Sequence, residues 1–331
     1  MKKIFISILI ILLLGVAVIW QGIYLPKSLL GGKTINFTVE KGDGAKKIAH
    51  TLQKEGIIKQ ASLLRAYVYI KKTAGNLRAG EYELSSTMNI PQIVEKFISG
   101  DVIKEQITII EGWNLKDISS YLEEKGIYQK EEFSKAVNKD FSQEFDFLKD
   151  KPKSSGLEGY LFPDTYQVVK GENAEEFVGR TLQNFGKKLT DDLRQEIKRQ
   201  NKTIFEIITM ASVLEKEVKT KEDKEIVSGI FWKRIKEKMP LQSCATIAYI
   251  KGENQWQYSY ANTRIESPYN TYLNLGLPFG PISNPGIDSI KAAIYPKETE
   301  YNFFLTDPET GKTIFSKTYE EHNANKSKYL K

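Results

Sequence analysis

The stretch TIFEIITMASVLEKEV, residues 203–218, places two carboxyl groups where they could do chemistry. Thr203 and Glu206 have the T-x-x-E spacing of a capping box, which predicts that a helix begins there. Glu215 and Glu217 follow near the end of that helix. Residues two positions apart on a helix face different sides, so the two glutamates must have different surroundings.

One face of this predicted helix is apolar, and Glu215 lies within it. At about 100° per residue, the face consists of Ile204, Ile207, Ile208, Ala211 and Val218. Apolar surroundings disfavour a carboxylate, so we expect the pKa of Glu215 to exceed its reference value of about 4.3. A glutamate with a pKa of roughly 6–7 suits general acid catalysis near neutral pH. The structural alternative is an ion pair between Glu215 and a lysine or arginine in the core.

Two further stretches combine glycine, proline and aromatic residues with polar groups. GLEGYLFPDTYQV, residues 156–168, alternates its side chains and predicts an extended segment with a turn at Pro163-Asp164. SPYNTYLNLGLPFGPISNPG, residues 267–286, predicts a long ordered loop, and such loops are usually functional. Aromatic rings beside carboxyl and amide groups suit a sugar-binding groove, with ordinary core packing of the rings as the alternative.

The N-terminus predicts a membrane anchor. Residues 4–20 contain no charge, and the apolar run continues to Leu25, which is long enough to span a bilayer. Lys2 and Lys3 on the short tail favour a cytoplasmic N-terminus, so the rest of the chain would lie outside the cytoplasm. A cleaved signal peptide is the competing interpretation, but no small-x-small site follows the run.

An internal repeat follows at an offset of 70 residues. Residues 39–57 align without gaps on residues 109–127, with six identical positions among 19. Each copy predicts a strand, a tight glycine turn and a short amphipathic helix closed by a glycine. A strand–helix unit of this kind resembles LysM-type carbohydrate-binding modules. A packing unit that is simply used twice is an equally good interpretation.

These elements predict an α+β fold. The expected organisation is a cytoplasmic tail and anchor (1–25), a linker (26–33), a small LysM-like module (34–104) and a larger mixed domain (105–331). Three local predictions accompany it: a strand and a capped helix in 77–100, a helix after Gly286 stopped by Pro296, and a C-terminal hairpin turned at 307–311 and followed by a helix.

Composition excludes several kinds of site. The chain has 48 basic and 42 acidic residues, so its net charge of +6 argues only weakly for an anionic partner. Cys244 is the only cysteine, which rules out an intramolecular disulfide. His50 and His322 are far apart in sequence, so a histidine–cysteine metal site is not expected. No motif indicates a cofactor, a nucleotide or a nucleic acid.

Several motifs in order resemble one enzyme family. EGYLFPDTY, ASVLEKE, LQS, SPYNTY, a GLP-GPI-NPG run and FSKTYEEHN resemble the endolytic murein transglycosylases, the YceG-like family. The resemblance implies a single-pass enzyme of the cell (inner) membrane that faces outward. Such a lyase cuts nascent peptidoglycan between MurNAc and GlcNAc and leaves 1,6-anhydroMurNAc ends, which terminates strand growth. It needs no cofactor, and peptidoglycan synthases are the implied partners.

The resemblance also implies roles for particular residues. The family's catalytic glutamate, the first in A-S-x-x-E-K-E, carries onto Glu215, the residue that the apolar face selects. The groups expected to hold the glycan are Tyr166, Gln242, Asn270 and Tyr272, with Glu158 as a possible second carboxylate. The family often has aspartate after L-Q-S, where this chain has Cys244, so any role of that aspartate near Gln242 is in doubt here.

Two other functions are open at this stage. A muramidase of the same architecture would hydrolyse the glycan with water, and it would need a second carboxylate near Glu215. Glu158 and Asp164 are the candidates for that carboxylate. A non-catalytic, membrane-anchored wall-binding or scaffold protein would instead tolerate the loss of Glu215.

Overall fold

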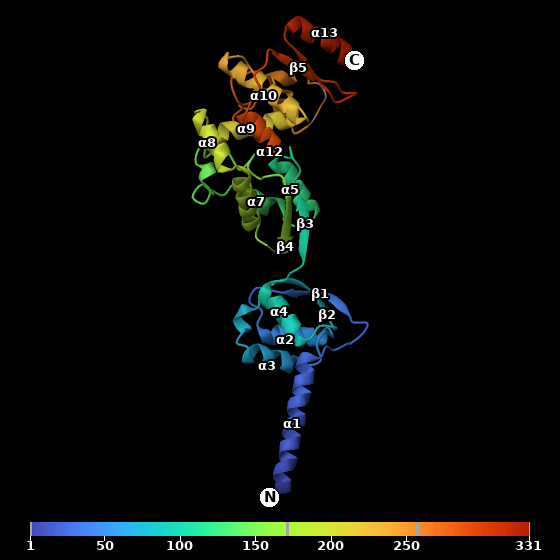
Figure 1. Cartoon of the computed structure of the whole chain (residues 1–331). Coiled ribbons are helices and arrows are strands. Elements are labelled where there is room, and N and C mark those ends of the chain that lie inside the picture. Colours follow the sequence, from blue (N-terminus) through green and yellow to red (C-terminus); the bar gives the residue numbers. More distant parts are fainter. Residues whose placement is uncertain (1, 170–171, 254, 256–257, 331) are drawn as a thin grey trace. The chain divides into compact units, whose positions relative to one another are not determined.

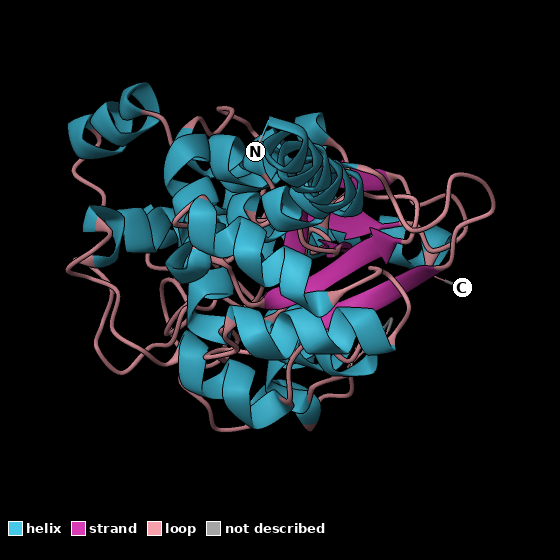
Figure 2. Cartoon of the chain, turned by 90° about the horizontal axis from the view of Figure 1, so that it is seen from below, coloured by secondary structure: helices cyan, strands magenta, loops and turns pink. Residues whose placement is uncertain are grey.

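The computed structural model describes residues 2–169, 172–253, 255 and 258–330. Met1 of the predicted tail and Lys331 of the predicted larger domain lie outside them. The chain divides into two compact units, Met1–Gln106 with Gln167–Glu172, and Ile107–Tyr166 with Asn173–Lys331. Helices and short paired strands occur in both units (Figures 1 and 2), which confirms the predicted α+β class.

Helix α1, Lys2–Tyr24, is the long apolar helix at the N-terminus (Figure 1). Within the described part of the chain it is the one helix long and apolar enough to cross a membrane, judged by length and composition. Its last turn packs on the first unit, where Ile23 is buried. A Cβ atom at Gly22 would lie 2.3 Å from Leu63 Cδ1, so glycine permits this close approach.

The first unit pairs two strands with short helices. Strands β1 (Thr34–Val39) and β2 (Gly80–Ser85) are antiparallel, with Thr34 opposite Ser85 and Val39 opposite Gly80. Alternate residues of both strands point into the core, because side chains of a strand alternate between its faces. The helical elements are α2 (Ala45–Lys54), α3 (Ala61–Ile70), η1 (Ala74–Asn76) and α4 (Ile90–Ser99).

Helix α4 has the ends that its sequence predicts. Asn89 and Gln92 form a capping box, in which each side chain accepts a bond from the other residue's backbone N–H. Gly100 ends the helix in the left-handed conformation with φ of 73°. The predicted strand and capped helix in 77–100 are therefore confirmed.

The two repeat copies share their local geometry. In the first copy, β1 leads to Gly42 with φ of 97°, and α2 is closed by Gly56 with φ of 78°. In the second copy, the corresponding values are 79° at Gly112 and 68° at Gly126, on either side of α5 (Leu115–Glu124). Left-handed backbone of this kind favours glycine, so the repeated glycines are there for the turns. The second copy lies in the second unit.

The second unit is mainly helical. Strands β3 (Lys104–Thr108) and β4 (Thr165–Val169) form a two-stranded sheet, and the boundary of the unit falls within both strands. The helical elements before the central helix are α5, α6 (Lys130–Val137), η2 (Asp146–Leu148), α7 (Ala174–Lys188) and α8 (Asp191–Arg199). The later elements are α10 (Lys221–Lys236), α11 (Cys244–Lys251), η3 (Asn262–Arg264), α12 (Ile287–Ile294), β5 (Phe303–Thr306), β6 (Thr313–Ser316) and α13 (Tyr319–Tyr329).

Helix α9, Ile204–Glu217, is the centre of this unit. Helices α8, α10, α11 and α12 all contact it, as their grouping in Figure 1 indicates. Every residue from Ile207 to Leu214 is buried, so the helix has no solvent-exposed face over two turns. The predicted single apolar face is therefore wrong. A helix covered on all sides is apolar throughout, and its sequence cannot show which side faces a site.

The stretch 156–168 is extended only at its end. Strand β4 begins at Thr165, and the residues before it form turns. Tyr160 is fully buried, with its ring centroid 5.2 Å from that of Phe185 and 6.2 Å from that of Phe147. Core packing of the aromatic rings is therefore the correct interpretation for this residue.

The C-terminal prediction is confirmed. Strands β5 and β6 pair as an antiparallel hairpin, with Phe303 opposite Ser316. The Asp307 carboxylate accepts bonds from the Glu309 N–H at 2.9 Å and the Thr310 hydroxyl at 2.6 Å, which fixes the turn. The single cysteine, Cys244, is free.

Gly229 tests the packing of α10, and Gly179 in α7 is its control. A Cβ atom at Gly229 would lie 2.0 Å from the Lys297 carbonyl oxygen, so we expect Gly229→Ala to lower the free energy of unfolding by about 1–3 kcal/mol. Gly179 in α7 has open space, and Gly179→Ala should stabilise by up to about 1 kcal/mol. Urea unfolding measures the free energy of unfolding of both variants. Equal changes in the two would contradict the close contact between Gly229 and Lys297.

Candidate active site

The capping box of α9 forms as predicted and fixes where both glutamates fall. The Thr203 N–H donates to Glu206 Oε2 at 2.7 Å, and the Glu206 N–H donates to Thr203 Oγ1 at 3.1 Å. With its start set there, the helix reaches Glu215 and Glu217 in its last turn. The two carboxyl groups have separate sets of partners, as expected for residues two positions apart.

Glu215 lies in a buried ion pair. Its Oε1 atom accepts a bond from Lys224 Nζ at 2.9 Å, and the two side chains are only 8% and 5% exposed. Its Oε2 atom accepts from the Gly286 N–H at 2.9 Å and the Ser289 hydroxyl at 2.7 Å. These contacts join α9 to α10 and to the start of α12. The expected apolar surroundings of Glu215 are therefore wrong, and the ion-pair alternative is correct.

A second carboxyl group lies beside this ion pair. The Glu111 carboxyl occupies the space where a side chain at position 286 would begin, since a Cβ atom at Gly286 would lie 1.9 Å from Glu111 Oε1. Burial raises the pKa of Glu111, and the charge of Glu215 raises it further, whereas Lys224 lowers it. Sequence reasoning missed Glu111, because only the fold brings it to α12.

Glu217 has different surroundings. Its Oε1 atom accepts bonds from the Ser243 hydroxyl and, at 3.3 Å, from the Ala245 N–H near the start of α11. Burial raises the pKa of the Glu217 carboxyl, although these two bonds and the charge of Arg234 lower it. A carboxyl pKa raised by burial is what the sequence led us to expect for Glu215, although the partners of Glu217 are polar rather than apolar.

Glu217 also lines a cavity of about 700 Å³. Polar groups around it come from α10, the segment between α10 and α11, α11 itself, the loop after η3, and α13: Arg234, Gln242, Cys244, Tyr272, His322 and Lys326. Aromatic and aliphatic side chains of β5 complete the wall. Among the described residues that line this cavity, Glu217 is the one carboxyl group.

Two predicted glycan-holding residues lie in this cavity. Gln242 is exposed and adopts a left-handed backbone with φ of 51°, and its N–H donates to the Thr271 carbonyl at 3.0 Å. The Tyr272 hydroxyl lies 3.1 Å from Cys244 Sγ. Burial raises the pKa of the Cys244 thiol, so a neutral group stands at the position where the family resemblance implies an aspartate.

Asn270 and Tyr166 are occupied within the protein. Asn270 is fully buried, and its amide donates to the carbonyls of Thr263 and Ile265 at 3.1 and 2.8 Å. The Tyr166 hydroxyl donates to the Phe162 carbonyl at 2.5 Å. Both side chains hold the local chain in place, so the prediction that they contact glycan is not supported by their positions.

The two predicted second carboxylates also have structural partners. Glu158 accepts two bonds from the Leu115 N–H, at 3.1 and 3.2 Å, at the start of α5. Burial raises the pKa of Glu158 to about 8, so it is mainly uncharged at pH 7. Asp164 accepts a bond from Asn184 at 3.0 Å, which lowers its pKa. Neither is among the described residues that line the cavity of Glu217.

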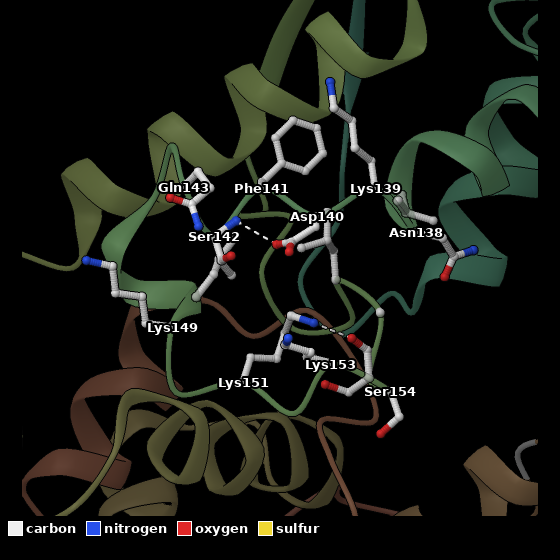
Figure 3. Close-up of a pocket in the computed structure, with 15 residues that line it drawn as sticks. Asn138, Lys139, Asp140, Phe141, Ser142, Gln143, Lys149, Lys151, Lys153 and Ser154 are labelled. Atoms are coloured by element: carbon white, nitrogen blue, oxygen red, sulfur yellow. Dashed lines mark hydrogen bonds between the residues drawn. The ribbon is translucent and has the colours of Figure 1, made fainter.

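A second cavity, of about 400 Å³, lies in the segment from Val137 to Leu157. Figure 3 shows lysine side chains around it, but Lys139 pairs with Glu175 at 2.6 Å, and Lys151 donates to the Ser155 carbonyl. None of the predicted site residues lines it. Groups of His, Cys, Asp or Glu suited to a metal ion are absent among the described residues.

The ion pair gives a stability prediction. Lys224→Met leaves Glu215 buried without its counter-charge, so we expect a loss of about 3–5 kcal/mol in the free energy of unfolding. Adding Glu215→Gln to that variant removes the unpaired charge and should restore part of the loss. Urea unfolding at pH 7 measures both, and a loss below about 1 kcal/mol in Lys224→Met would contradict the pair's structural role.

Glu158 gives a prediction on pH. Its folded pKa of about 8 exceeds the ordinary value of 4.5, so between these values the native state binds more protons than the unfolded state. Stability therefore falls as pH rises through this window, by at most about 1.4 kcal/mol per pH unit. Glu158→Gln should remove that slope between pH 5 and 8, whereas the exposed control Glu95→Gln should keep it.

The sequence and the structure were compared with known proteins. The YceG-like family model matches residues 37–328. The chain is 33% identical to the endolytic murein transglycosylase of Bacillus subtilis (strain 168) over 308 residues, which cover 90% of this chain and 85% of that protein. It is 29% identical to the protein of the same name from Streptococcus pneumoniae serotype 2, covering 92% of this chain and 60% of the relative. A crystal structure of a YceG-like protein from Listeria monocytogenes has a TM-score of 0.60 at 32% identity, covering 89% of this chain and 100% of that one. This chain therefore belongs to the YceG-like family.

Proposed function

We propose that this chain is an endolytic lytic transglycosylase of peptidoglycan, with Glu217 as its catalytic acid. The activity is supported by its relatives, which are named endolytic murein transglycosylases. The observation that carries the assignment of the acid is the cavity of about 700 Å³, which one half-buried carboxyl group lines among polar and aromatic side chains.

Glu217 is favoured over Glu215, the residue that the family resemblance first indicated. The Glu215 carboxylate already has a cation and two hydrogen-bond donors, and it is 8% exposed. A carboxylate held in this way joins helices, since protonating it would break the ion pair between them. Glu217 borders a cavity large enough for sugar units, and burial favours its protonated form.

The reaction then needs one carboxyl group. The protonated Glu217 gives its proton to the oxygen that links MurNAc C1 to GlcNAc, and the C1–O bond breaks. The resulting carboxylate takes the proton from the MurNAc C6 hydroxyl, whose oxygen bonds to C1. The products are a 1,6-anhydroMurNAc end and a free GlcNAc hydroxyl, and no water is consumed. The nucleophile belongs to the substrate, so a second carboxylate is unnecessary.

The partners of Glu217 fit both of its forms. Burial favours the acid before proton transfer, and the bonds from Ser243 and Ala245 stabilise the carboxylate that follows. Gln242 and Tyr272 are the proposed contacts to the sugar. Both line the cavity, where Gln242 offers an amide and Tyr272 a phenol hydroxyl. Aromatic rings in the same wall suit the apolar faces of pyranoses.

The placement in the cell is part of the proposal. Helix α1 has the length and composition of a single membrane span, and Lys2 and Lys3 favour a cytoplasmic N-terminus. The larger unit would then act outside the cell (inner) membrane on nascent strands, and peptidoglycan synthases are the proposed partners. Residues 34–104, within the first unit, are the proposed LysM-like module, and their paired strands and packed helices are consistent with it.

Product analysis tests the activity and the acid together. The wild-type protein incubated with peptidoglycan should release fragments with 1,6-anhydroMurNAc ends, identified by mass spectrometry. Glu217→Gln should lower the rate at least about 10²-fold, the usual contribution of a general acid. The double variant Glu215→Gln/Lys224→Met, which removes both charges of the ion pair, should keep measurable activity if circular dichroism shows that it is folded.

The pH dependence of the same assay follows from Glu217. Its acid form persists above the ordinary pKa of 4.5, and activity should fall as pH rises through the raised value. Reducing ends in place of anhydro ends would show a muramidase. Activity that survives Glu217→Gln but disappears in the folded double variant would show that Glu215 is the catalytic acid. Release of no fragments by the wild type would leave only a wall-binding role.

A further inference from the structure

His322 is a polar residue of the cavity that the proposed reaction does not use. It lies on α13, and its ring stacks on Phe303 of β5 with centroids 5.2 Å apart and planes 20° apart. This stacking fixes the plane of the imidazole. The side chain lines the same cavity as Glu217, Gln242 and Tyr272.

The two ring nitrogens of His322 have different surroundings. Nδ1 is fully buried and has no hydrogen-bond partner among the described residues. Nε2 is therefore the nitrogen that can reach a ligand in the cavity. Among the residues that the structure describes, Nδ1 has no partner in either neutral tautomer, but a hydrogen on Nδ1 could be donated to nothing, whereas a hydrogen on Nε2 can be donated into the cavity. The neutral ring is thus expected to carry its hydrogen on Nε2.

The charges around the ring keep it neutral. Burial lowers the pKa of His322, and the cations Lys326 and Arg234 lower it further. The other titratable groups that line the cavity are the Glu217 carboxyl, the Cys244 thiol and the phenols of Tyr258, Tyr272 and Tyr319. An imidazolium would also place a hydrogen on the partnerless Nδ1, so the cavity offers a neutral donor rather than a cation.

We propose that His322 binds the glycan by donating its Nε2–H to the carbonyl oxygen of an N-acetyl group, and so positions the strand at Glu217. The inference rests on the proposed function of this cavity. An amide carbonyl is a strong neutral acceptor, it occurs on every sugar of the strand, and its partner needs no charge. His322 acts here as a substrate-binding residue, and the proton transfers stay with Glu217.

Three variants distinguish the contribution of the hydrogen-bond donor of His322 from that of its aromatic ring. His322→Phe keeps an aromatic ring against Phe303 but has no donor, whereas His322→Gln places an amide donor near the position of Nε2. Asn323→Ala is the matched control, because Asn323 lies on the same helix α13 but is exposed and is not among the described residues that line the cavity. All are made in the full-length Glu217→Gln protein, so that binding is measured without cleavage.

The assay measures the affinity for glycan strands freed of stem peptides, with and without their N-acetyl groups. On N-acetylated strands, His322→Phe should weaken binding about three- to tenfold, the usual value of one neutral hydrogen bond. His322→Gln should recover most of the loss, and Asn323→Ala should have no effect. On de-N-acetylated strands, His322→Phe and His322→Gln should bind equally.

Other outcomes would overturn the proposal. Equal binding of N-acetylated strands by His322→Phe and the parent protein would show that His322 does not contribute a contact to the glycan. An equal loss on both kinds of strand would show that the acceptor is another group. Affinity that rises as pH falls through about 6.5, the ordinary pKa of histidine, would show a cationic donor. If the protein with Glu217 intact releases anhydro ends in all these cases, the proposed function stands and only the role of His322 fails.

Discussion

The buried ion pair between Glu215 and Lys224 is the interaction on which the geometry of the larger unit depends. It links α9 to α10, and the second oxygen of Glu215 links α9 to the start of α12 through Gly286 and Ser289. A buried charge without a partner is costly, so these helices are held in one arrangement. That arrangement fixes the rotation of α9 about its axis, and with it the direction of Glu217.

Two carboxyl groups two residues apart thus have different tasks. Glu215 holds the helices together, and Glu217, which faces α11, opens into the cavity that contains Gln242 and Tyr272. Their separation follows from the helical period alone. Cys244 keeps a second negative charge out of this cavity, so a raised pKa of Glu217 reflects burial rather than repulsion by a neighbouring carboxylate.

The sequence predicted features that depend on nearby residues. The capping box of α9, the glycine at the end of α4 and the turn at Asp307 are each made by residues within a few positions of one another. The apolar-face argument for Glu215 failed because α9 is buried on all sides, so its partners come from α10 and α12. The stretches rich in aromatic and polar residues likewise could not show which side chains face the cavity. Tyr272 lines it, while Asn270, two positions earlier in the same loop, is buried. Only the fold distinguishes them.

A crystal structure of the Glu217→Gln protein with a bound glycan fragment would show which carboxyl position meets the scissile bond. We expect the oxygen between MurNAc and GlcNAc to lie within hydrogen-bond distance of the residue 217 side chain, with the ion pair of Glu215 and Lys224 intact. A fragment bound against Glu215, with that pair opened, would contradict this expectation.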